Sequence, residues 1–342
     1  MFRNTLAGAL SGLLLLVACA GPAATPTPAP TTAPTTAPTA TPGWPSSLVI
    51  GFVPSREAPA LVETIKPIAD WLTQKLGVTV EGYVSTDYTG LVTAMETGQA
   101  QIGAFGPFAM IQAVDRAGAE IILQSERNGS GTYHTQFFTT NPDAYCAEAP
   151  VENERTVDDQ PVMYLNCNGT ERGPTDTPEG PIGADVLADI PAGTVVSFVE
   201  ETSASGYIFP VTVLQNAGID TTTAIEPLFA GGHDASVIAV CEGNAEVGVS
   251  FDDARTVATS DCDIPGTVVV FAYGPEIPND GVVVAGDLPA DLKAAIKQAL
   301  LDYAATEEGK TVLGEVYNIT AFAEPDLDAL QIVRDAAENL PE

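Results

Sequence analysis

The chain has 342 residues, and its 45 acidic and 13 basic side chains give it a formal net charge of −32. A nucleic acid is excluded as a partner, because binding to a phosphate backbone requires many Lys and Arg side chains. Such acidity is typical of a soluble, exposed protein and says little about the ligand.

The first eighteen residues predict an export signal. Arg3 precedes a short apolar run from Leu13 to Val17, which is too short to cross a bilayer as a mature helix. The segment Leu16-Val17-Ala18-Cys19 resembles the bacterial lipobox, in which a cysteine is lipidated and becomes the new N-terminus. The alternative is an ordinary secretory peptide in which Cys19 is incidental.

Residues 19–46 predict an extended tether. Eight prolines lie between positions 22 and 45 among Thr and Ala, a composition without apolar periodicity. A tether of this kind is most useful directly behind a lipid anchor. We therefore expect an extracytoplasmic protein held on the bacterial cell membrane by lipid on Cys19.

From residue 47 onward, about 296 residues suggest two lobes. The first shows alternating strand and helix patterns, with Leu61, Ile65, Ile68, Leu72 and Leu76 on one helical face. Strands are predicted at 48–53, 78–84, 102–105 and 120–124, and further helices at 88–96 and 107–116. This rhythm favours an α/β lobe with a largely parallel sheet.

An excursion at 141–181 interrupts the pattern. It is rich in Pro, Gly, Asn, Asp and Thr, so we expect little regular structure beyond a short strand near 162–165. With Cys19 lipidated, four cysteines remain. Sequential pairing, Cys146 with Cys167 and Cys241 with Cys262, is favoured over the two other connectivities because each pair brackets one local segment in an oxidising compartment. A zinc site is the weaker alternative, because the chain has no CxxC motif and only two histidines.

The α/β rhythm then resumes and predicts a second lobe. Strands are expected at 194–198, 225–229, 246–251 and 267–271, with helices at 205–216 and from 234. The last seventy residues are mainly helical and should pack back on the first lobe. The expected organisation is lobe 1 at 47–138 with 268–342 and lobe 2 at 139–267, each a mostly parallel sheet flanked by helices. The chain should cross between lobes near 137–140 and 267–272.

Two segments at strand-to-helix junctions carry the ligand chemistry. Thr202, Ser203 and Ser205 cluster where a helix should begin, and the unpaired backbone N–H groups there favour a phosphate-like anion. Helix capping is the alternative, but it needs only one hydroxyl. At the second junction, His233 follows Gly231-Gly232 and can donate a hydrogen bond to an oxyanion, although a solitary His is often structural.

Six segments in order resemble the substrate-binding proteins of bacterial phosphate, phosphite and phosphonate importers. They are Ser85-Thr86-Asp87-Tyr88, Gly103-Ala104-Phe105-Gly106-Pro107, Thr132-Tyr133, Ser203-Ala204-Ser205-Gly206-Tyr207, Gly232-His233-Asp234 and Ile277-Pro278-Asn279-Asp280. The resemblance covers most of residues 48–320 and implies the type II periplasmic-binding-protein fold, with the ligand in a cleft between two lobes.

The resemblance also implies the site. By motif position, Tyr88, Tyr133, Ser203, Ser205 and His233 would close around the anion, and Asp253 and Asp280 would face the amine of an aminoalkylphosphonate. Asp252 is an adjacent alternative to Asp253. Thr202 and Ala204 belong to the same hydroxyl segment, but Ala204 stands where the family commonly has threonine. That departure leaves the anion open.

These features predict a binding protein for a small oxyanion. The resemblance implies the same function and adds that the protein delivers the oxyanion to the permease subunits of an ABC importer. It would work as a monomer, without cofactor or metal and without performing chemistry. A sensory lipoprotein for a similar oxyanion is an alternative from a different class. An exported hydrolase is disfavoured, because the chain lacks a GxSxG motif and a histidine set for zinc.

Overall fold

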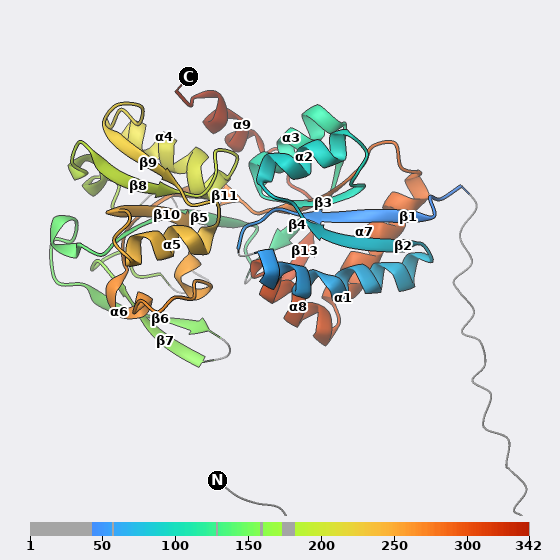
Figure 1. Cartoon of the computed structure of the whole chain (residues 1–342), viewed down its shortest axis with the longest axis horizontal. Helices are drawn as coiled ribbons and strands as arrows, with labels where there is room; N and C mark the ends of the chain where they lie inside the picture. The colour runs from blue at the N-terminus through green and yellow to red at the C-terminus, as the bar shows by residue number, and fades with distance from the viewer. Residues whose placement is uncertain (1–42, 57, 128, 158–159, 173–181, 342) are drawn as a thin grey trace, which may run out of the picture. The chain divides into compact units, whose positions relative to one another are not determined.

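The computed structural model describes residues 43–56, 58–127, 129–157, 160–172 and 182–341, which contain two separate β-sheets (Figure 1). The predicted export signal, Cys19 and nearly all of the tether lie outside the described residues. No helix within the described part of the chain combines the length and apolar character that crossing a membrane requires.

The first sheet has six strands in the order β13-β4-β12-β3-β1-β2. Its strands are β1 (Ser47–Phe52), β2 (Thr79–Val84), β3 (Ile102–Phe105), β4 (Glu120–Glu126), β12 (Gly281–Val284) and β13 (Ala321–Ala323). Strand β1 pairs in parallel with β2 and β3, whereas β12 runs antiparallel to β3 and β4. The sheet is therefore mixed rather than mostly parallel, because β12 enters it from the opposite direction after the chain has visited the second sheet.

Helices cover both faces of this sheet. Figure 1 shows α2 (Tyr88–Glu96) and α3 (Pro107–Ala117) on one face, and α1 (Ala58–Leu76) and α8 (Glu307–Tyr317) on the other. Helix α7 (Ala290–Ala304) packs against α1, whereas α9 (Gln331–Glu338) contacts α3 of this lobe and also elements of the second lobe. The five residues predicted to share one face of α1 are all at most 5% exposed, and four of them join a core with β1 and α7. The periodicity of that segment thus correctly identified its buried face.

The second sheet has seven strands in the order β6-β7-β11-β5-β10-β8-β9. Its strands are β5 (Thr132–Thr139), β6 (Val151–Val157), β7 (Gln160–Asn166), β8 (Thr194–Phe198), β9 (Ile225–Phe229), β10 (Val247–Phe251) and β11 (Val269–Pro278). Adjacent residues Phe137 and Phe138 of β5 enter separate core clusters, as side-chain alternation along a strand requires. Helices α4 (Phe209–Asn216) and α5 (His233–Cys241) contribute to these two clusters, and α6 (Ile264–Thr267) is a single turn. This sheet is also mixed, because β5 runs antiparallel to both β10 and β11.

The chain crosses between the sheets at 127–131 and 279–280, which differs from the expected boundaries. Strands β5 and β11 pair with each other over most of their length, and both belong to the second sheet. The predicted divisions at 138/139 and 267/268 would have placed β5 and β11 in lobe 1, apart from their other partners β10 and β7. Lobe 1 accordingly comprises residues 47–126 and 281–323, and lobe 2 comprises residues 132–278, while α9 contacts both lobes.

The excursion at 141–181 has more regular structure than its composition predicts. It contributes a short 3₁₀ turn at Pro142–Ala144 and the β6–β7 hairpin, which extends the second sheet through the pairing of β7 with β11. Residues 158–159 and 173–181 lie outside the described part. Cys146 pairs with Cys167 and Cys241 with Cys262, so the sequential connectivity is confirmed.

Candidate functional site

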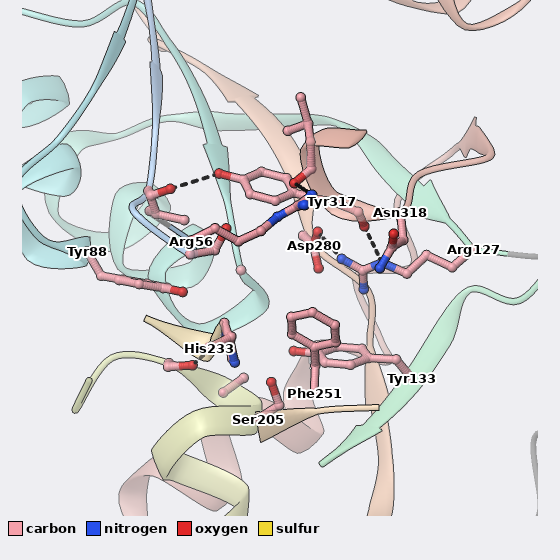
Figure 2. A pocket seen from close by; sticks show the side chains of 16 residues that line it. Arg56, Tyr88, Arg127, Tyr133, Ser205, His233, Phe251, Asp280, Tyr317 and Asn318 are labelled. Carbon is pink, nitrogen blue, oxygen red and sulfur yellow. Dashed lines mark hydrogen bonds and ion pairs between the residues drawn. The ribbon is translucent and has the colours of Figure 1, made fainter. Parts of the chain in front are cut away.

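A polar pocket brings together residues of both lobes and both crossings (Figure 2). Lobe 1 contributes the turn after β1, the start of α2 and the end of α8, and lobe 2 contributes β5 and the starts of two helical segments. The lining residues are Val53, Ser55, Arg56, Tyr88, Gly106, Arg127, Tyr133, Ser203, Ala204, Ser205, His233, Phe251, Asp280, Val316, Tyr317 and Asn318. Seven of the nine predicted ligand-binding residues are in this set, and Thr202 and Asp253 are not.

The hydroxyl segment begins a helical stretch, as its sequence predicts. Ser203 is the N-cap residue of a π-helical segment, η3 (Ala204–Ile208), which continues into α4. Its Oγ accepts a hydrogen bond from the Gly206 backbone N–H at 3.1 Å. A Cβ on Gly206 would lie 2.4 Å from a methyl carbon of Val199 and 2.7 Å from this Oγ, so only glycine lets the chain turn this tightly. The turn holds Ser203, Ala204 and Ser205 against the pocket.

His233 is the first residue of α5 and is fixed by two contacts. Its Nδ1 lies 2.8 Å from Ser250 Oγ, and its Nε2 lies 3.5 Å from Ser203 Oγ. A Ser250 hydroxyl that donates to Nδ1 leaves the imidazole proton on Nε2, on the side of Ser203. Burial, together with Arg127 and Arg56, lowers the pKa of His233 to about 3, so the ring is neutral at physiological pH.

The lowered pKa makes a prediction about the imidazole. Since the pKa lies below the unfolded value of about 6.5, the folded protein should keep His233 neutral while pH falls through that value. Stability linked to this residue is present above pH 6.5 and is lost as pH falls toward the folded pKa of about 3. NMR spectra of the ring protons, assigned with a His233→Gln variant, should show no His233 titration between pH 5 and 8. A midpoint within that interval would contradict the buried, neutral ring.

The phenols across the pocket also remain protonated. Burial raises the pKa of Tyr88 and of Tyr133 well above the ordinary value, and Asp280 adds to both effects. Both side chains can therefore donate O–H hydrogen bonds at neutral pH. Tyr317 uses its own O–H on the Val53 carbonyl at 3.0 Å.

Two lining arginines were not identified from the sequence. Arg56 follows β1, and Arg127 lies at the first crossing between the lobes. In Figure 2 both side chains point to the pocket beside Tyr317. Together with Asp280 they give the described lining one net positive charge, within a chain whose net charge is −32. The available signal was that Lys and Arg are scarce, 13 in 342 residues, which makes each of them a candidate for a specific role.

Asp253 does not reach the pocket. Its carboxylate is buried within lobe 2, where it accepts hydrogen bonds from Arg255 and Gln136 and forms an ion pair with Arg155. The motif position therefore misplaced this carboxylate. Thr202 does not line the pocket either, and its Oγ1 is buried without a hydrogen-bond partner among the described residues.

The lobes also touch across the pocket. The backbone N–H of His233 donates to the Ser55 carbonyl at 3.0 Å, and the backbone N–H of Tyr88 donates to Glu200 Oε2 at 3.0 Å. Hydroxyl, phenol, imidazole and guanidinium donors thus converge from two lobes, while Asp280 is the sole carboxylate among the described lining residues.

This architecture is that of a type II solute-binding protein, with two mixed α/β lobes and a polar pocket between them. Residues 50–330 match the family model described as "ABC transporter, phosphonate, periplasmic substrate-binding protein". The chain belongs to this family, and the resemblance inferred from its six segments is confirmed. Its members are substrate-binding proteins rather than enzymes.

Individual relatives agree with this assignment. The chain is 27% identical over 222 residues to the phosphate-import protein PhnD of Mycolicibacterium smegmatis. These residues make up 61% of this chain and 56% of that protein. The chain thus spans little more than half the length of that relative. It is 22% identical over 291 residues to the phosphonates-binding periplasmic protein of Escherichia coli K12, with coverage of 84% and 75%.

Solved structures show the same fold. PhnD1 from Prochlorococcus marinus in complex with methylphosphonate superposes with a TM-score of 0.68 and 17% identity, covering 86% of this chain and 97% of that one. A binding protein component of an ABC phosphonate transporter from Pseudomonas aeruginosa gives a TM-score of 0.66 and 19% identity, with 85% of each chain covered.

Proposed function

We propose that this protein is the extracytoplasmic substrate-binding lipoprotein of an ABC importer and that it binds a small phosphorus oxyanion. The observation that carries the proposal is the set of donors in one pocket: the hydroxyls of Ser203 and Ser205, the neutral imidazole of His233 and the phenols of Tyr88 and Tyr133. A phosphorus oxyanion presents several acceptor oxygens and is matched by such a set. The names of its relatives, which concern phosphate and phosphonates, support the same class of ligand.

Binding would close the two lobes around the anion. Ser203, Ser205 and His233 belong to lobe 2, whereas Tyr88 belongs to lobe 1, so one anion can satisfy both sets only when the lobes are together. The closed, loaded monomer would then present the anion to the permease subunits. Contacts across the pocket, such as that of His233 with Ser55, support this arrangement.

A ligand screen by thermal unfolding tests the proposal. A ligand that binds only the folded protein raises its stability by about 2.7 kcal/mol at 100 times its dissociation constant. Phosphate, phosphite or methylphosphonate should produce a saturable rise in Tm, and the matched alkanesulfonate should produce less. If no phosphorus oxyanion changes Tm at millimolar concentration, the proposed function is wrong.

The lipid anchor is tested separately by replacing Cys19. Cys19→Ala should yield a protein that is exported but no longer attached to the membrane, because the proposed attachment is the lipid on this thiol. Fractionation after a high-salt wash measures this, with the parent protein as control. Recovery of the Cys19→Ala protein in the membrane pellet would refute the lipoprotein assignment.

A further inference from the structure

The carboxylate that lines the pocket is already paired. Arg127 Nη2 lies 2.5 Å from Asp280 Oδ2, and the two side chains are only 19% and 11% exposed. A ligand ammonium group that approached Asp280 would therefore meet a guanidinium at the same carboxylate. Both residues lie where the chain crosses between lobes, and both line the pocket.

Arg127 is held in this position by further contacts. Its Nε donates to the Tyr317 carbonyl at 2.8 Å, and its Nη1 donates to Asn279 Oδ1 at 3.0 Å. Asn279 is fully buried and is itself anchored, because its Nδ2 donates to the carbonyls of Ser125 and Ser130 at 3.0 and 2.8 Å. The guanidinium also lies over the Tyr133 ring, 5.1 Å from the centroid. Moving Arg127 away from Asp280 would break a network that joins the two crossings.

A second guanidinium adds to the positive charge. Arg56 Nη2 donates to the carbonyls of Glu315 and Val316 at the end of α8, which are neutral acceptors. Asp234 and Glu315 also act electrostatically on this guanidinium, but neither carboxylate lines the pocket. The positive charge of Arg56 therefore remains at the pocket wall. Arg56 and Arg127 both contribute to lowering the pKa of His233, so both are close enough to act on a charge held there.

We propose that Arg127 is a specificity-determining residue, which makes the pocket select a phosphorus oxyanion that carries no ammonium tail. The preferred class is phosphate, phosphite or an alkylphosphonate, and an aminoalkylphosphonate is rejected because Arg127 occupies Asp280 and repels the amine. The inference rests on the proposed function, and it replaces the expectation that Asp253 and Asp280 face an amine. Asp253 lies outside the pocket, and Asp280 is neutralised by Arg127.

Calorimetric titration with methylphosphonate and 2-aminoethylphosphonate tests this selectivity. The parent protein should bind methylphosphonate at least about tenfold more tightly, because a cationic tail would face a pocket lining with a net positive charge. Arg127→Gln should shift the ratio of the two dissociation constants by about tenfold or more toward 2-aminoethylphosphonate, because Asp280 becomes available. The double variant Arg127→Gln/Asp280→Asn should lose this shift.

Arg116→Gln is the matched control, since Arg116 forms an exposed ion pair with Glu96 away from the pocket, and it should leave the ratio unchanged. A parent protein that binds both ligands equally overturns the inference, whether or not the variants fold. So does a folded Arg127→Gln protein whose ratio stays within about twofold of the parent. A parent that binds neither phosphate nor either phosphonate contradicts the proposed function instead.

Discussion

Replacing Asp253 with asparagine should lower the free energy of unfolding by about 3–5 kcal/mol, the range for removing one partner of a buried ion pair. Asp253 Oδ2 lies 2.7 Å from Arg255 Nη2 and 3.3 Å from Arg155 Nε, with side chains that are 3%, 0% and 7% exposed. Although burial alone would raise it, these arginines hold the pKa of Asp253 at about 2. The variant would leave buried guanidinium groups without their main counter-charge.

Urea unfolding of the purified protein measures this effect. Asp70→Asn is the matched control, because Asp70 and Lys66 form an exposed i,i+4 pair, and such pairs contribute about 0.3–0.5 kcal/mol. Since Arg155 belongs to β6, the Asp253 variant should also loosen the β6–β7 hairpin, which faster amide exchange in Val151–Val157 would report. A loss of less than about 1 kcal/mol would show that Asp253 is not the main counter-charge of these arginines.

Ser203→Ala and His233→Ala should each weaken binding of the preferred oxyanion by about 1.5–3 kcal/mol, the range for a hydrogen bond to a charged group. This corresponds to roughly 10- to 150-fold in the dissociation constant. The two losses should not add, because Ser203 Oγ and His233 Nε2 are 3.5 Å apart and would share one anion. Ser203→Ala should also cost about 1 kcal/mol of stability, because its Oγ caps the Gly206 N–H.

Thr202→Ala is the control for this experiment. Thr202 belongs to the same hydroxyl segment, yet it does not line the pocket, and its Oγ1 has no hydrogen-bond partner within the described part of the chain. The Thr202→Ala substitution should change the dissociation constant of the oxyanion by less than about twofold, since it removes no contact to the ligand. If Thr202→Ala weakens binding as much as Ser203→Ala, the two hydroxyls are assigned to the wrong roles.

Local sequence signals predicted local structure well. Strand 102–105 and helix 88–96 have the expected bounds, and the hydroxyl segment does begin a helical stretch. Each of these depends on periodicity or on capping chemistry within a few residues. The sequential disulfides are likewise local, since each closes one short segment.

The features that were missed depend on pairing between distant residues. Nothing in the sequence of β5 or β11 specifies which sheet it joins, so the lobe boundaries were misplaced. Asp252 and Asp253 could not be assigned for a related reason. Among their partners, Arg155 and Arg172 come from the excursion at 141–181, and Arg255 comes from the turn after β10. Only the folded chain brings these charges together. Arg127 was overlooked because its role depends on Asp280, which is 153 residues away.

A crystal structure of the protein grown with saturating methylphosphonate would locate the bound anion directly. We expect one phosphonate group in the pocket, with its oxygens within hydrogen-bonding distance of Ser203 Oγ, Ser205 Oγ and His233 Nε2. The phenols of Tyr88 and Tyr133 should contact the same group. A pocket without the phosphonate, or a phosphonate bound at full occupancy elsewhere on the protein, would contradict the proposed anion site.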